Sequence, residues 1–239
     1  MAGELNFAGL WPRPLLMPLR LTDADAVVFD FNGTLSDDED VLAEVFTSIA
    51  ADLGVSLSAE EYVADFLGRS DQEICVGLLE RAGADPARLP QLLAQVAEKY
   101  NAAVAVQPAI GPEACALVTA LHELGKPLAV VTGASRATVL PALDSVGLLE
   151  RFRVIVTEED VATGKPDPEG LRIAARAMGL ADEARVVVFE DSVPGLDAAL
   201  AGGMNAVAVR GALSESQAAE RGVTMVDGLG LGLLELTLS

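Results

Sequence analysis

Residues 26–35 read Ala-Val-Val-Phe-Asp-Phe-Asn-Gly-Thr-Leu, and this stretch decides the fold. Its first four residues are an apolar run that ends at an acid, Asp30. A short apolar run bounded by polar turn residues is typical of a strand that is buried on both faces. An acid that closes such a strand and is followed by Gly33-Thr34 is hard to explain structurally, because burying a charge is costly. We therefore expect Asp30 to carry chemistry.

The same apolar pattern recurs later in the chain, and helical patterns fill the intervals between the recurrences. The further strand-like runs lie at residues 127–131, 154–157, 186–189 and 206–209. The helix-like segments between and after them lie at residues 112–124, 137–146, 168–178 and 193–201. This alternation predicts an α/β fold with a parallel, Rossmann-like sheet that carries helices on both faces.

The interval between Ser36 and about Val106 breaks the alternation, because its patterns are helical only. These helices are expected at residues 40–53, 58–66, 72–81 and 89–101. An all-helical insert directly after the first strand predicts a lid, or cap domain. We divide the chain into an N-terminal extension at residues 1–24, an α/β core at 25–36 and 107–239, and a helical cap at 37–106.

The charge of the chain limits its partners. The formal net charge is -20 over 239 residues, and nucleic acids and anionic membranes need a basic surface. No apolar run approaches the ~20 residues that span a membrane. Prolines interrupt the apolar start of the chain, which lacks the features of a signal peptide. We therefore expect a cytoplasmic protein that binds neither nucleic acid nor membrane.

The first four predicted strands are each followed by polar groups that are useful in catalysis. The first strand is followed by Asp30-Phe31-Asn32-Gly33-Thr34, and the second by Thr132-Gly133. The loop after the third carries Lys165, and the fourth is followed by Glu190-Asp191. Ligands of open parallel sheets bind beyond the carboxyl ends of the strands. The sequence therefore predicts one crevice that holds carboxylates, a hydroxyl and a lysine.

This ordered set resembles the four motifs of the haloacid dehalogenase superfamily, in the branch with a helical cap after the first motif. Asp30 to Thr34 match motif one, Thr132 matches motif two, Lys165 matches motif three, and Glu190-Asp191 match motif four. The resemblance covers nearly the whole chain from Asp25 onward. It implies a phosphatase-type hydrolase in which Asp30 is the nucleophile.

The resemblance also implies roles for the other residues. A carboxylate can attack phosphorus only if the repulsion between the two anions is cancelled, and a bound Mg²⁺ would do this. The expected metal ligands are Asp30, Glu190, Asp191 and the backbone carbonyl of Asn32. Lys165 would neutralise the nucleophile and the phosphoryl group, and Thr132 would hold phosphoryl oxygens. Gly133 and Ser135 are expected to bind substrate.

Asn32 departs from the family pattern, which usually has an Asp there to protonate the leaving oxygen and to activate water. An amide has no titratable proton. Three interpretations stay open: a phosphatase for substrates with good leaving groups, such as acyl phosphates; replacement of the acid by another residue, for example from Asp37-Asp38-Glu39-Asp40; or a phosphate-binding or regulatory module without turnover. A deliberately introduced Asp→Asn change would give the same sequence.

The predicted cap offers one residue for substrate recognition. Residues 66–71 interrupt two cap helices, and by resemblance this loop dips into the active site. Its Arg69 could bind a second anionic group of the substrate. We expect Mg²⁺-dependent hydrolysis of a small phosphorylated metabolite by a monomer or homodimer, and a catalytically impaired binding module is the alternative.

Overall fold

The computed structural model describes residues 19–180 and 185–238, and one six-stranded parallel sheet organises them. The strand order is β4-β3-β2-β5-β6-β7, so the strand that leads into Asp30 lies near the centre. The strands are β2 (Ala26–Phe29), β3 (Leu128–Val131), β4 (Val154–Val156), β5 (Val186–Glu190), β6 (Asn205–Val209) and β7 (Thr224–Val226).

Helices cover both faces of this sheet, as the sequence predicted. Val27 and Phe29 belong to one hydrophobic cluster with α5 (Pro112–Glu123) and α6 (Arg136–Ser145). Their neighbours Ala26 and Val28 belong to a second cluster with the helices of the other face. Those helices are α7 (Glu169–Ala177), α8 (Val193–Ala201) and α9 (Glu215–Glu220). Alternate residues of one strand thus face opposite layers, which explains why the strand is apolar throughout. The α/β fold class is confirmed.

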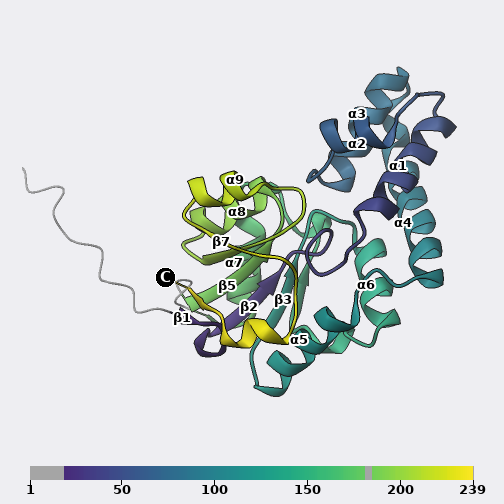
Figure 1. Cartoon of the computed structure of the whole chain (residues 1–239). Coiled ribbons are helices and arrows are strands. Elements are labelled where there is room, and N and C mark those ends of the chain that lie inside the picture. Colours follow the sequence, from purple (N-terminus) through teal and green to yellow (C-terminus); the bar gives the residue numbers. More distant parts are fainter. Residues whose placement is uncertain (1–18, 181–184, 239) are drawn as a thin grey trace, which may run out of the picture.

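Four helices between β2 and α5 form the helical cap, shown as the group of blue helices in Figure 1. They are α1 (Glu39–Asp52), α2 (Ala59–Asp65), α3 (Asp71–Ala82) and α4 (Leu89–Val106). Within the cap, α1 contacts α2 and α4, and α3 contacts α4. The last cap helix, α4, also packs against α6 of the core. The predicted boundaries of the cap stay a prediction.

The described part of the predicted N-terminal extension is joined to the C-terminal end of the chain. Strand β1 (Leu19–Arg20) pairs antiparallel with β8 (Thr237–Leu238), and Leu21 is fully buried. Residues 1–18 lie outside the described residues. Within the described ranges, no helix is long and apolar enough to cross a membrane.

Several short elements were absent from the sequence-based expectation. They are β1, β7, β8, α9 and the 3-10 helices Leu21–Asp23, Pro86–Arg88, Leu149–Arg151, Glu158–Asp160 and Leu231–Glu235. Each spans few residues, so hydrophobic periodicity has too little length to reveal it.

Candidate active site

The sheet register brings the first acid of the site beside the last residue of the next strand. Phe29 of β2 pairs with Phe189 of β5, and their rings stack with centroids 5.3 Å apart. The backbone N–H of Asp30 donates to the carbonyl of Phe189 at 3.0 Å. Asp30 and Glu190, each one residue further on, therefore lie next to each other at the carboxyl ends of central strands.

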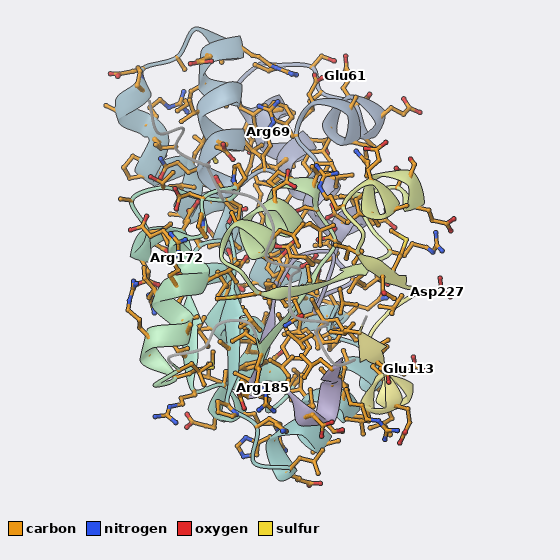
Figure 2. All side chains as sticks on the ribbon, turned by 90° about the vertical axis from the view of Figure 1, so that its left-hand side faces the viewer. Glu61, Arg69, Glu113, Arg172, Arg185 and Asp227 are labelled. Carbon is orange, nitrogen blue, oxygen red and sulfur yellow. The ribbon has the colours of Figure 1, made fainter. Side chains whose placement is uncertain are left out.

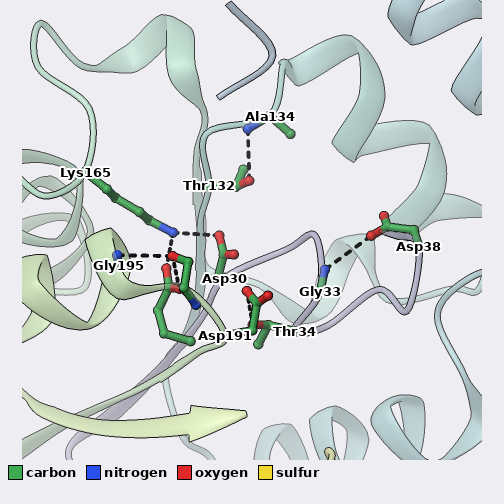
Figure 3. Close-up of polar contacts among 11 residues, drawn as sticks. Asp30, Gly33, Thr34, Asp38, Thr132, Ala134, Lys165, Asp191 and Gly195 are labelled. Carbon is green, nitrogen blue, oxygen red and sulfur yellow. Dashed lines mark hydrogen bonds and ion pairs between the residues drawn. The ribbon is translucent and has the colours of Figure 1, made fainter. Parts of the chain in front are cut away.

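Lys165 bridges these two carboxylates, and Figure 3 shows its contact with Asp30. Its Nζ donates to Asp30 Oδ1 at 2.7 Å and also to Glu190 Oε1. The side chains of Lys165, Asp30 and Glu190 are only 18%, 11% and 1% exposed. Burial opposes the charged form of Lys165, but the charges of Asp30 and Glu190 outweigh this and raise its pKa. The lysine therefore stays a cation at neutral pH.

The second oxygen of Glu190 is held by the start of α8. Glu190 Oε2 accepts from the backbone N–H of Ser192 at 3.1 Å and from its hydroxyl at 2.9 Å. The Ser192 hydroxyl accepts in turn from the N–H of Gly195 at 3.1 Å, so Ser192 caps the helix. Both oxygens of Glu190 thus accept hydrogen bonds, and Ser192 rather than the acidic pair caps α8.

Asp191 completes a cluster of three carboxylates. Its Oδ1 accepts from the Thr34 hydroxyl at 3.3 Å, and its Oδ2 accepts from the backbone N–H of Ala212 at 3.1 Å. One oxygen each from Asp30, Glu190 and Asp191 lie within 4.8 Å of one another. Burial, and next the charge of Glu190, raise the pKa of Asp191 to about 7, and the same two causes raise the pKa of Asp30.

This donor set fits a divalent cation. Three buried carboxylates surround a single lysine cation, so the cluster holds more negative than positive charge. Carboxylate oxygens are the ligands that Mg²⁺ prefers, and Mg²⁺ usually takes only one or two of them. Asp30 and Asp191 fit this role best, because both line the pocket whereas Glu190 does not.

Two of the residues predicted after β3 lie at the pocket, and the third contacts the cap. Thr132 and Gly133 line the pocket, and the Thr132 hydroxyl accepts from the N–H of Ala134 at 3.0 Å. Ser135 is not among the lining residues. Its N–H donates to Asp71 Oδ2 at 3.2 Å, and its hydroxyl lies 2.9 Å from that of Thr138.

The start of α3 docks directly onto the core at this point. The backbone N–H of Asp71 donates to the carbonyl of Gly133 at 3.3 Å, and that of Gln72 donates to Glu158 Oε2 at 3.1 Å. A Cβ on Gly133 would lie 3.1 Å from the Cβ of Ser70, so glycine permits this close approach. Sequence reasoning missed Glu158, although it stands one residue after Thr157 at the end of a predicted strand, where functional groups were expected.

Asn32 lines the pocket, and its side-chain amide donates to Asp38, a residue that does not line the pocket. Asn32 Nδ2 donates to Asp38 Oδ2 at 2.8 Å, and the N–H of Gly33 donates to Asp38 Oδ1 at 3.2 Å. From the same acidic run, Glu39 lines the pocket, and its Oε2 is buried without a hydrogen-bond partner in the described structure. Burial, and next the charge of Asp38, raise the pKa of Glu39 to about 7.

The pocket lies between cap and core and has a volume of about 420 Å³. The core contributes Asp30, Thr132 and Lys165 to its wall, and the cap contributes Tyr62 and Arg69. Arg69 is exposed, and its guanidinium lies 5.8 Å from the centre of the Phe66 ring. Figure 2 shows Arg69 and Glu61 at the cap end of the molecule and Arg185 at the opposite end. Of the nine predicted site residues, all but Ser135 and Glu190 line this pocket.

Gly195 is the tightest backbone position of the site, which leads to a first prediction. A Cβ there would lie 1.9 Å from the carboxyl carbon of Glu190. In an ordinary helix, Gly→Ala stabilises by about 1 kcal/mol. We expect Gly195→Ala instead to lower the free energy of unfolding by about 1–3 kcal/mol, because Glu190 must move.

Urea denaturation measures this effect, with Gly228→Ala as the matched control, because no atom lies within 4 Å of a Cβ at Gly228. If Gly195→Ala is at least as stable as the wild type, the packing of Glu190 against α8 is not as described.

The contact between cap and core predicts a pH dependence of stability. Burial raises the pKa of Asp71 from 3.8 to about 7, with smaller contributions from Asp38 and Glu159. A raised carboxyl pKa means that the folded state favours the protonated form. Stability from this group is therefore full below about pH 4 and is lost as the pH rises through 7.

We expect Asp71→Asn to flatten this dependence, so that its melting temperature gains on the wild type between pH 5 and pH 8. Thermal denaturation across that range measures it, with the exposed Asp144→Asn as the control. A difference between wild type and Asp71→Asn that is the same at every pH would contradict the linkage.

Comparison with known proteins places the chain in a family. Residues 27–209 match the family model described as "Haloacid dehalogenase-like hydrolase". The chain is 32% identical over 186 residues to a plasmid-encoded phosphoglycolate phosphatase of Cupriavidus necator, covering 77% of this chain and 80% of that protein. It is 30% identical over 207 residues to Protein SUPPRESSOR OF QUENCHING 1, chloroplastic, of Arabidopsis thaliana; the match covers 84% of this chain but only 19% of that protein.

Among solved structures, CbbY from Rhodobacter sphaeroides in complex with phosphate superposes with a TM-score of 0.78 at 26% identity. That match covers 89% of this chain and all of the other, 100%. The family model covers more than half of the chain, and its range runs from β2 to the end of β6. The chain therefore belongs to the haloacid dehalogenase-like hydrolase family.

Proposed function

We propose that this protein hydrolyses a small phosphorylated metabolite, a phosphate monoester or an acyl phosphate, with Mg²⁺ and through a phosphorylated Asp30. The observation that carries the proposal is the contact of Lys165 with Asp30 and Glu190 at the base of a pocket. It holds a carboxylate oxygen in place and adds the positive charge that an incoming phosphoryl group requires. The family match and the phosphatase names among the relatives support the same reaction.

The reaction proceeds in two displacements at phosphorus. In the first, an oxygen of Asp30 bonds to phosphorus, and the bond from phosphorus to the leaving oxygen breaks. In the second, a water oxygen bonds to the same phosphorus, the bond to Asp30 breaks, and inorganic phosphate leaves. Lys165 stabilises the charge on the transferred group, and Thr132 with the N–H groups near Gly133 orients its oxygens.

The residues that would hold Mg²⁺ are Asp30, Asp191, Glu190 and, through its backbone carbonyl, Asn32. A bound Mg²⁺ would supply the positive charge that cancels repulsion between Asp30 and the phosphoryl oxygens. Asp30 and Asp191 are the ligands we favour, because they line the pocket and Glu190 does not.

Asn32 determines which substrates react well. Its amide can hydrogen-bond to a leaving oxygen but cannot protonate it, and such protonation is worth about 10²–10⁴ in rate. Acyl phosphates and activated esters need little protonation, so we propose them as the better substrates. The same residue supports the second candidate function, a phosphate-binding or regulatory module with little turnover.

Recognition of the rest of the substrate falls to the cap in this proposal. Arg69 lines the pocket from an exposed position and would bind a second anionic group. A cytoplasmic location, the absence of nucleic-acid and membrane partners, and a monomeric or homodimeric state stay predictions.

The test is turnover of an activated phosphate ester, p-nitrophenyl phosphate, with and without Mg²⁺. We expect turnover by the wild type that needs Mg²⁺ and is lost in Asp30→Ala, because Asp30 is the group that accepts the phosphoryl in this proposal. Asp227→Ala is the matched control, since the side chain of Asp227 is 90% exposed.

Equal turnover in the wild type and Asp30→Ala would contradict the proposal that the protein hydrolyses phosphate esters through Asp30. Phosphate binding without turnover would support the binding module instead. Retention of turnover after complete removal of divalent cations would contradict the role of Mg²⁺.

A further inference from the structure

The carboxylate of Asp38 is buried behind Asn32 and bound to it. We propose that Asp38 is a positioning residue, which fixes the Asn32 amide at the pocket through a hydrogen bond that only a donor at position 32 can make. This inference rests on the proposed function, in which Asn32 lies beside the leaving oxygen of the substrate. It makes Asn32 and Asp38 a matched pair.

The position of Asp38 in the chain suggests a helix-capping role, but its side chain makes other hydrogen bonds. Asp38 is the residue before α1, where an aspartate usually accepts from the first N–H groups of the helix. Its side chain makes no such capping bond. It turns back to the loop after β2 and accepts from Asn32 and Gly33, as Figure 3 shows for Gly33.

The hydrogen-bond partners of this carboxylate donate to it. Oδ2 accepts from Asn32 Nδ2 at 2.8 Å and from the Tyr100 hydroxyl, and Oδ1 accepts from the N–H of Gly33. The Tyr100 hydroxyl also lies 3.2 Å from that of Ser36. Asp38 is 1% exposed, and Tyr100 and Ser36 are fully buried. Water therefore does not reach these groups, and the loss of one hydrogen bond would leave its partner unsatisfied and lower the stability of the fold.

This polarity decides which residue position 32 accepts. An amide N–H satisfies Oδ2 of Asp38, whereas a carboxylate at the same place would set two acceptors against each other at 2.8 Å. The hydrogen bonds of this loop therefore favour an asparagine over an aspartate at position 32. Asp38 itself is an unsuitable proton donor for the reaction, since it does not line the pocket and its oxygens are occupied.

The same contacts connect the amide to the cap. Tyr100 belongs to α4, the last cap helix, and Asp38 directly precedes α1, the first. Asn32 lies in the loop after β2 of the core and forms a β-bridge with Ser36. One buried carboxylate thus joins core loop, first cap helix and last cap helix, so a movement of the cap also moves the support of the amide.

The test is a double-mutant cycle in which the polarity of the pair is broken and then reversed. The variants are N32D, D38N and N32D/D38N, with D37N as the matched control, because Asp37 is exposed and adjacent. In the double variant an amide at position 38 can donate to a carboxylate at position 32 and still accept from Gly33. We expect D38N to lower the melting temperature in the wild-type background but to raise it in the N32D background.

This reversal of sign requires no turnover, so it tests the pairing even if the proposed function fails. Additive effects of N32D and D38N on melting temperature would overturn the pairing. If the wild type turns over p-nitrophenyl phosphate, kcat tests the positioning role separately from stability.

We expect D38N to lower kcat by about tenfold to a hundredfold, with little change in KM, since misplacement of a group near the reacting atoms costs about this much. Adding D38N to N32D should restore kcat, as it restores the melting temperature. A kcat that is unchanged in D38N would reduce Asp38 to a structural role and overturn the positioning.

Discussion

The ammonium of Lys165 lies between the carboxylates of Asp30 and Glu190, and the rest of the site depends on this interaction. Asp30 and Glu190 each follow the paired residues Phe29 and Phe189, so their nearly buried carboxylates lie close together. Without the lysine these two negative charges would repel each other. The lysine reduces that repulsion, yet the third carboxylate, Asp191, leaves the cluster with excess negative charge. A divalent cation could balance this excess negative charge. The fold supplies the frame, because central strands of a parallel sheet end side by side.

Much of this arrangement could be predicted from the sequence. The apolar runs before Asp30 and Glu190 identify buried strands, and polar residues at their ends predict a shared crevice. What could not be predicted is how hydrogen bonds are divided among residues that are neighbours in the chain. Glu190 and Asp191 stand next to each other, but the first is held by Lys165 and Ser192 and the second by Thr34 and Ala212. Ser135 follows the predicted motif two and yet binds the cap, because the start of α3 docks there. Such divisions depend on tertiary contacts that hydrophobic periodicity does not encode.

The run Asp37-Asp38-Glu39-Asp40 makes the same point within four residues. The sequence indicates a charged helix start, and α1 does begin there. Its members nevertheless lie in different surroundings: Asp37 and Asp40 are exposed, Asp38 is bound by Asn32 and Tyr100, and Glu39 lines the pocket. In our proposal, Asn32 is one half of a local pair with Asp38, to which its amide donates.

The central claim is that Asp30 and Asp191 hold one divalent cation beside Lys165. The most direct measurement is the melting temperature of the purified wild type and of Asp191→Asn as Mg²⁺ is added, with Asp197→Asn as the control for lost charge, because Asp197 lies within α8 and pairs with Arg221 rather than with the carboxylate cluster. A ligand at a hundredfold excess over its Kd stabilises the folded state by about 2.7 kcal/mol. We expect a rise of several degrees in the wild type and in Asp197→Asn, and no rise in Asp191→Asn. A wild type that does not respond to Mg²⁺, or an equal rise in Asp191→Asn, would contradict it.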